Sequence, residues 1–133
     1  MNLLLARAAV NDANIHFDRL YSYLIPAQLV GKVYPGSMVL VPFGRGNKAR
    51  MAVVLAVEEA EETDAPQRLK SLYDAAPEEA RLTPDLLELV RFLKERTFCT
   101  WFEAVKAVIP YGAQYRPATV DGRPVMQSRL TRS

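Results

Sequence analysis

The chain has 133 residues, half of them hydrophobic, which suits one domain with a sizeable core. Its net charge of +2 is too small to predict a nucleic-acid partner, so any such case must rest on local clusters of cations. The single cysteine excludes an intrachain disulfide. No apolar run approaches the roughly 18 residues of a membrane span, and the N-terminus does not resemble a signal peptide. We therefore expect a cytoplasmic protein.

The first third of the chain predicts two strands and a turn. Residues 3–10 are apolar apart from Arg7, and residues 21–25 are rich in aromatic and aliphatic side chains. Residues 34–37 carry proline and glycine at the two central positions of a type II turn.

The next segment predicts a hairpin. Residues 38–41 and 51–57 are apolar strands, the first of them covered on both faces, and the polar loop 44–50 joins them. Residues 58–66 then turn acidic without an apolar face, which is typical of a solvated loop. Residues 68–73 are expected to form a further strand.

Two helices should follow. Thr83 is a good N-cap and Pro84 suits the first helical position. The apolar positions that follow share one helical face, which consists of Leu86, Leu89, Val90 and Leu93. A second short helix is expected over residues 101–108, and the aromatic residues and cysteine at 98–102 should lie where the two helices meet.

The sequence therefore predicts an α+β fold, in which a small, mostly antiparallel β-sheet or barrel precedes two short helices. The folded domain is expected to cover residues 1–112. Residues 113–133 contain proline, glycine and four arginines but few large apolar side chains, and we interpret them as a linker or as the start of a missing domain.

Catalysis has little support in this sequence. His16 is the only histidine and is expected to be a surface or hydrogen-bonded residue, and Cys99 is expected to be a buried, inert thiol. No second cysteine or paired histidine accompanies them, so neither a metal site nor a nucleophile with its base is predicted. The glycines at 44 and 46 do not form a nucleotide-binding fingerprint, and no cofactor is expected.

The polar loop at residues 44–50 carries Arg45, Lys48 and Arg50. Cations beside glycine amides suit a DNA phosphodiester, but the same loop is also compatible with a solvated hairpin tip. Tyr21 and Tyr23 should face the same side of a strand, where they either stack on bases or belong to the core. Lys70, taken alone, is an ordinary surface lysine.

An ordered set of motifs nevertheless resembles a known family. It comprises Asp-Arg-Leu-Tyr-Ser-Tyr-Leu-Ile-Pro at residues 18–26, the segment 36–44 with its Val-Pro-Phe-Gly, the strand at 51–57, Leu-Lys at 69–70, Leu-Thr-Pro at 82–84 with its helix, and Phe-Cys at 98–99 leading to Ile-Pro at 109–110. Over roughly residues 4–111 the chain resembles the N-terminal DNA-binding domain of the primosomal protein N′ (PriA) helicase family.

The resemblance implies a noncatalytic domain that recognises the 3′ end of a nascent strand at a stalled or abandoned replication fork. The end-binding residues that the resemblance implies are Tyr21, Ser22, Tyr23, Gly44 and Lys70. The loop cations Arg45, Lys48 and Arg50 are predicted to bind the DNA backbone because of their charge. The family often has aspartate in place of Ser22, and a serine carries no charge and reaches less far. The alternative is a small protein-interaction barrel that docks on a replication partner.

The resemblance also implies the partners. These are forked or 3′-ended DNA, the remaining domains of a helicase that begin with a winged helix, single-strand-binding protein and other primosome proteins, with no membrane. The ATP, magnesium and structural zinc of the full-length family belong to domains that this chain lacks. We therefore expect the chain to bind DNA without unwinding it.

Overall fold

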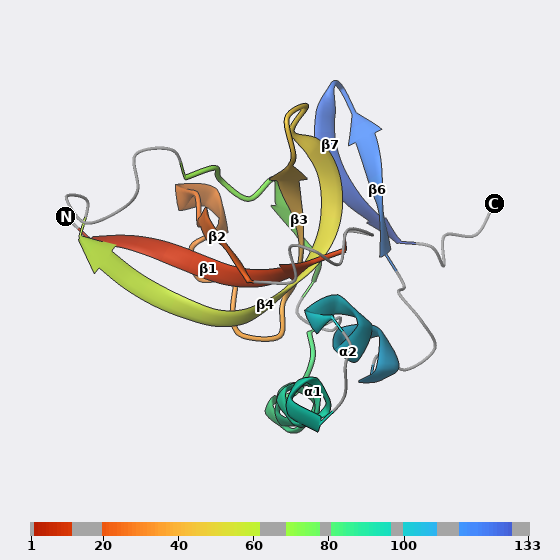
Figure 1. Cartoon of the computed structure of the whole chain (residues 1–133). Coiled ribbons are helices and arrows are strands. Elements are labelled where there is room, and N and C mark those ends of the chain that lie inside the picture. The colour runs from red at the N-terminus through yellow and green to blue at the C-terminus, as the bar shows by residue number, and fades with distance from the viewer. Residues whose placement is uncertain are drawn as a thin grey trace.

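The computed structural model describes residues 2–11, 20–61, 69–77, 81–96, 100–108 and 115–128. It contains a five-stranded sheet, two helices packed beside it and a separate two-stranded hairpin (Figure 1). This arrangement confirms the predicted α+β class. The elements in chain order are β1 (Asn2–Val10), β2 (Tyr21–Leu24), the 3₁₀ turn η2 (Ala27–Leu29), β3 (Met38–Phe43), β4 (Lys48–Glu61), β5 (Asp74–Ala75), α1 (Pro84–Arg96), α2 (Trp101–Val108), β6 (Tyr115–Val120) and β7 (Arg123–Ser128).

The strand order in the sheet is β2-β1-β4-β3-β5, and all neighbours are antiparallel. The two edges of the sheet meet just before β5, where the Leu24 amide donates to the Lys70 carbonyl (2.8 Å) and the Leu72 amide donates to the Leu24 carbonyl (3.0 Å). This contact is a single parallel bridge between Leu24 and Ser71. The described strands therefore form a curved sheet joined at one point, and not a closed barrel.

Both faces of the central strands are buried, as the continuous apolar run of β3 predicted. Met38 and Leu40 face a cluster that also contains buried residues of α1 and α2. Val39 and Val41 face a second cluster on the other side of the sheet, with Tyr23 and η2 residue Leu29. The alternation of β3 thus divides the core into a helix-facing half and a half that lies inside the curve of the sheet.

Two predictions about the segments after the hairpin were wrong. Glu58 and Glu59 do not begin a loop, because β4 continues to Glu61 and its acidic end pairs with Asn2–Leu5 of β1, with both glutamates exposed. Residues 69–73 do not form a strand beyond the bridge at Ser71. Both results depend on pairing with distant segments, which local composition does not reveal.

The turn and the helices begin where the sequence predicted. Gly36 has φ 98°, and the Ser37 amide donates to the Tyr34 carbonyl (2.9 Å), as in a type II turn. Thr83 Oγ1 accepts from the Leu86 amide (3.3 Å) as the α1 N-cap.

The buried face of α1 is rotated from the expected one. Leu87 is 4% exposed although it was not predicted, while Leu89 is 42% exposed. The side of α1 that is buried is determined by its packing against α2 and the sheet. It is not determined by the widest apolar stripe in the sequence of the helix. Ahead of α2, Thr100 and Glu103 form a reciprocal capping box that the sequence analysis missed. Cys99 and Phe98 lie outside the described residues, so their expected place between the helices is untested.

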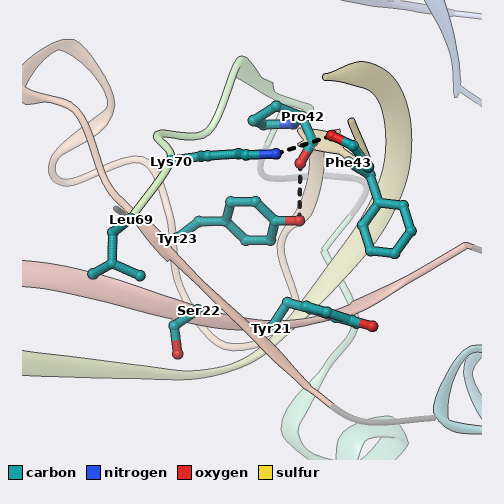
Figure 2. Close-up of a pocket in the computed structure, with 8 residues that line it drawn as sticks. Tyr21, Ser22, Tyr23, Pro42, Phe43, Leu69 and Lys70 are labelled. Atoms are coloured by element: carbon teal, nitrogen blue, oxygen red, sulfur yellow. Dashed lines mark hydrogen bonds between the residues drawn. The ribbon is translucent and has the colours of Figure 1, made fainter. Parts of the chain in front are cut away.

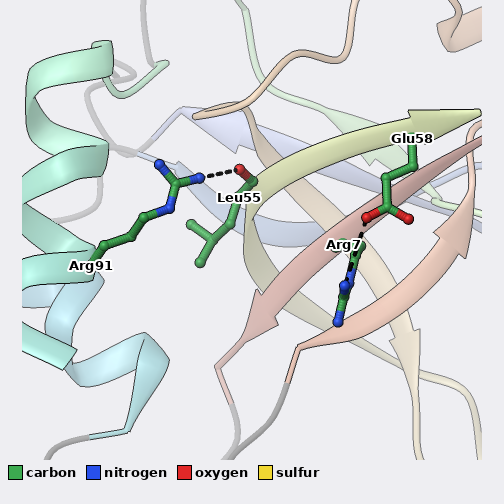
Figure 3. A network of polar contacts seen from close by, with 4 residues as sticks. All are labelled: Arg7, Leu55, Glu58 and Arg91. Atoms are coloured by element: carbon green, nitrogen blue, oxygen red, sulfur yellow. Dashed lines mark hydrogen bonds and ion pairs between the residues drawn. The ribbon is translucent and has the colours of Figure 1, made fainter. Parts of the chain in front are cut away.

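A hydrogen bond connects α1 to β4 (Figure 3), and it lies at a β-bulge of the strand. In the β1–β4 register Arg7 pairs with Ala56 and Ala8 with Val54, which leaves Leu55 as the extra residue. The Leu55 carbonyl accepts a hydrogen bond from Arg91 Nη2 of α1 at 3.0 Å. Arg91 therefore anchors the helix at the point where the regular ladder is interrupted.

The segment expected to be a linker or the start of a missing domain contains the hairpin β6–β7. Asp121 and Gly122 have φ 52° and 76° and form its two-residue turn, as expected for an Asp-Gly pair in a type I′ turn. β7 contacts β3 and β5, and β6 contacts β4. The Asp-Gly pair was the sequence signal for this hairpin, and we overlooked it; the domain boundary at residue 112 stays a prediction.

Candidate nucleic-acid interface

A pocket of about 280 Å³ opens where β2, the end of β3 and the segment before β5 meet (Figure 2). All five residues that the sequence predicted for end binding line this pocket. They come from three segments that are far apart in the chain, and the lining consists of Tyr21, Ser22, Tyr23, Pro42, Phe43, Gly44, Leu69 and Lys70.

The wall from β2 is aromatic because small residues of β1 leave room for its rings. Tyr21 pairs with Ala8 and Tyr23 with Ala6, and both alanines are fully buried. The ring of Tyr21 is half-buried and meets Phe43 edge to face, with centroids 5.1 Å apart. Tyr21 and Phe43 therefore present partly accessible aromatic surface to the pocket.

Tyr23 has a different role from Tyr21. It is 4% exposed, and its hydroxyl donates to the Pro42 carbonyl at 3.0 Å. Burial, and secondarily the proximity of Tyr21, raises the pKa of the Tyr23 phenol well above its ordinary value. Tyr23 is thus a neutral structural strut between β2 and β3, which matches the core alternative for one of the two tyrosines.

Ser22 lies at the margin of the pocket. It is exposed and pairs with Arg7 in the β1–β2 register, on the face of β2 opposite to the tyrosines. Its hydroxyl points away from the Tyr21 and Tyr23 rings in Figure 2. The structure therefore brings Ser22 to the pocket but does not direct its hydroxyl between the rings.

Gly44 and Lys70 form the opposite side of the pocket. Lys70 Nζ donates to the Gly44 carbonyl at 3.1 Å, one of the hydrogen bonds drawn in Figure 2. Gly44 has φ 76°, a conformation that favours glycine, and a Cβ placed there would meet no protein atom within 4 Å. The space next to its backbone is open, so a ligand can approach the main chain there.

The three cations of the predicted backbone-binding set are all exposed and lie next to the pocket. Arg45 follows Gly44 in the turn, while Lys48 and Arg50 occupy alternate positions at the start of β4. Lys48 pairs with the pocket residue Phe43, and Arg50 pairs with Val41. Because directly paired residues share a face of the sheet, Lys48 and Arg50 lie on the pocket side.

Three lining residues were not predicted as site residues. Pro42 and Phe43 belong to the Val-Pro-Phe-Gly motif and Leu69 precedes Lys70, so the signal was available in the motifs themselves. What sequence reasoning lacked was the Tyr21–Phe43 contact, which depends on long-range pairing.

Two further findings concern the part of the chain that the structure describes. Those residues contain no cluster of three side chains suited to hold a metal ion. None of the helices within the described ranges is long and apolar enough to cross a membrane. His16 lies outside the described residues, and its predicted role stays untested.

Comparisons of the sequence with known proteins identify a family. Residues 9–110 match the PriA 3′ DNA-binding domain (3′BD) family, a span that contains every predicted site residue. The chain is 29% identical over 100 residues to the replication restart protein PriA of Chlamydia trachomatis, covering 73% of this chain and 13% of that protein. It is 30% identical over 107 residues to the replication restart protein PriA of Bacillus subtilis, covering 79% of this chain and 13% of the relative. The chain thus spans about one eighth of the length of these relatives.

Proposed function

Because the chain belongs to the PriA 3′ DNA-binding domain family, we propose that the pocket between β2, β3 and Lys70 binds the terminal nucleotide of a DNA strand with a free 3′ end. The observation that carries the proposal is convergence: Tyr21, Gly44 and Lys70 come from three separate segments and line one pocket. The pocket volume of about 280 Å³ is just below the usual range for small-molecule sites, in keeping with a single nucleotide.

The chemistry of the lining suits such a ligand. The half-buried rings of Tyr21 and Phe43 offer an apolar surface on which a base can stack. The open space beside Gly44 admits the terminal sugar and its hydroxyl against the main chain. Lys70, exposed and already at the pocket mouth, supplies a cation to the last phosphate or a donor to the sugar.

The cations beyond the pocket suit the strand that leads to the end. Arg45, Lys48 and Arg50 are exposed and follow directly from Gly44 along the turn and β4. Their charges attract phosphates without regard to sequence, whereas the pocket selects an end. We therefore assign affinity mainly to the basic residues and end preference mainly to the pocket.

In the cell, we infer that this end is the 3′ end of a nascent strand at a stalled fork, since the two relatives are named replication restart proteins. The expected partners are the remaining domains of a longer helicase, single-strand-binding protein and other primosome proteins, with a cytoplasmic location because the ligand is fork DNA. The chain by itself is proposed to be noncatalytic, binding DNA without hydrolysing ATP.

A pair of glycine variants tests the pocket. Gly44 and Gly122 both have φ 76°, and a Cβ would meet no atom within 4 Å at either position. Alanine at each should cost a similar backbone penalty of about 1 kcal/mol. Only Gly44→Ala places a methyl group in the proposed sugar site, so it alone should reduce the preference for a free 3′ end.

The readout is fluorescence anisotropy with a single-stranded oligonucleotide that ends in either a 3′-hydroxyl or a 3′-phosphate. Lys70→Ala should also lose end preference by roughly tenfold, the effect of one charge-assisted hydrogen bond. If the Gly44 and Gly122 variants discriminate the two ends equally well, the pocket is assigned to the wrong residues.

The basic residues call for a different measurement. Replacing Arg45, Lys48 and Arg50 with alanine should weaken single-strand binding without unfolding the domain, because all three are exposed. The slope of log affinity against log salt should become shallower by about 0.7 for each phosphate that the variant no longer neutralises. A slope that stays the same would show that these residues are a solvated hairpin tip, and binding that resists salt would favour the protein-interaction alternative.

A further inference from the structure

The turn between β3 and β4, which joins the pocket to the three cations, is stabilised by hydrogen bonds from a neighbouring segment. Residues 44–47 form a tight turn in which Gly44 has φ 76° and Asn47 has φ 49°, both in the left-handed region. Within the turn the Asn47 amide donates to the Gly44 carbonyl at a distance of 3.2 Å. Because this hydrogen bond is at the long end of the usual range, it holds the turn that carries Arg45 only weakly.

Two side chains from one neighbouring segment donate hydrogen bonds to the two ends of this turn. Lys70 Nζ donates to the carbonyl of Gly44 at 3.1 Å, and the Tyr73 hydroxyl donates to the carbonyl of Asn47 at 2.8 Å. The donors are three residues apart, and so are the acceptors. The same short stretch of chain therefore fixes both the pocket end and the cation end of the turn.

The two anchors differ in how firmly they are held. Lys70 is exposed, and its side chain can leave Gly44 for another acceptor. The ring of Tyr73 packs against the helix-facing core, and its amide donates to the Leu40 carbonyl of β3 at 2.8 Å. The position of the Tyr73 hydroxyl is thus set by the core and by β3.

We propose that Tyr73 is a positioning residue for DNA binding, which keeps the basic turn in its binding shape when Lys70 leaves the Gly44 carbonyl for the DNA end. The inference rests on the proposed function, because it takes Lys70 to be a DNA ligand. It assigns Tyr73 no contact with DNA. Its effect passes through Asn47 and the turn to Arg45 and Lys48.

The test uses Tyr73→Phe in the whole chain, since phenylalanine keeps the packed ring and removes only the hydroxyl. Tyr34→Phe is the matched control, because the Tyr34 hydroxyl also donates to a main-chain carbonyl, that of Gly31, in a loop away from the pocket. Tyr73→Phe should weaken binding to a 3′-hydroxyl oligonucleotide by about threefold to tenfold, the value of one hydrogen bond, and Tyr34→Phe should not.

A second readout separates positioning from a general loss of stability. In the DNA-free chain, amide hydrogen exchange at Asn47 and Lys48 should rise slightly in Tyr73→Phe and in Lys70→Met. In the double variant it should rise by more than the sum of the two, since each anchor covers for the other. Exchange in α1 should not change.

The possible outcomes separate the two claims. If the parent chain prefers a 3′-hydroxyl end and Tyr73→Phe binds it as tightly as the parent, or if the exchange effects simply add, the positioning role of Tyr73 is overturned while the proposed function stands. A parent chain without end preference overturns the proposed function, and this inference with it.

Discussion

The Tyr23 hydroxyl illustrates how a single residue shapes the pocket through a hydrogen bond within the protein. It joins β2 to β3 through the Pro42 carbonyl at a position that is 4% exposed. The same bond fixes the backbone immediately before Phe43 and Gly44, so pocket geometry and core stability share one contact. A buried carbonyl without a donor lowers the stability of the folded state by more than the net value of an ordinary hydrogen bond. Loss of the Tyr23 hydroxyl should therefore have a large effect on stability.

Replacing Tyr23 with phenylalanine should therefore destabilise the domain by about 1–3 kcal/mol. The measurement is the free energy of unfolding from urea titration at neutral pH. Tyr34→Phe, which removes a hydroxyl from an exposed residue, should cost less than the buried substitution. Equal losses in the two variants would contradict the strut role of Tyr23.

The same phenol predicts a pH dependence. The pKa of Tyr23 is raised in the folded state above the ordinary value of 10.0, so both states hold the proton below pH 10 and the contribution to stability is complete there. Above pH 10 the unfolded state releases the proton first, and stability falls as the pH rises towards the folded pKa. The unfolding free energy of the parent should decline more steeply above pH 10 than that of Tyr23→Phe; parallel curves would refute a buried, protonated phenol.

Among the secondary-structure elements, α1 is linked to one irregularity of the sheet. The Leu55 carbonyl lies at the bulge of β4 and accepts a hydrogen bond from Arg91 of the helix (Figure 3). Figure 3 also contains a contrasting contact, the exposed pair of Arg7 with Glu58 at 3.6 Å. The first contact links a helix to a strand, whereas the second joins neighbouring strands that the ladder already holds.

We expect Arg91→Met to destabilise the domain by about 1 kcal/mol, since it removes a part-buried hydrogen bond between α1 and β4. Arg7→Met should cost clearly less, because exposed ion pairs contribute little. Thermal unfolding of the two variants makes the comparison, with the Arg7 variant as the control for loss of charge. A larger loss for Arg7→Met would contradict the anchoring role of Arg91.

Elements specified by local signals were predictable, and those specified by distant partners were not. The apolar runs of β1 and β3, the Pro-Gly turn at Gly36 and the Thr83 cap act within a few residues, and all appeared where expected. The acidic end of β4 is a strand only because β1 lies beside it. The β6–β7 hairpin had a local signal at Asp121-Gly122 that its proline-containing strands obscured.

At the scale of the whole molecule, the pocket exists because the curved sheet brings its edges together. The bridge between Leu24 and Ser71 places Lys70 opposite β2, and the β3–β4 hairpin delivers Gly44 to the same place. The spacing of these segments along the chain does not predict that they meet. The family resemblance nevertheless selected five residues that line one pocket, because the motifs of a family reflect contacts between distant segments that composition does not reveal.

The measurement that tests the account most directly is the affinity of the unmodified chain for one oligonucleotide with two different ends, a 3′-hydroxyl and a 3′-phosphate, at a single salt concentration. Phosphate contacts along the strand are the same in both, so only recognition of the end differs. We predict tighter binding to the 3′-hydroxyl strand, because the space beside Gly44 suits a hydroxyl and the added phosphate is bulkier and must be desolvated. Equal affinity for the two strands would contradict the assignment of the pocket to a DNA 3′ end.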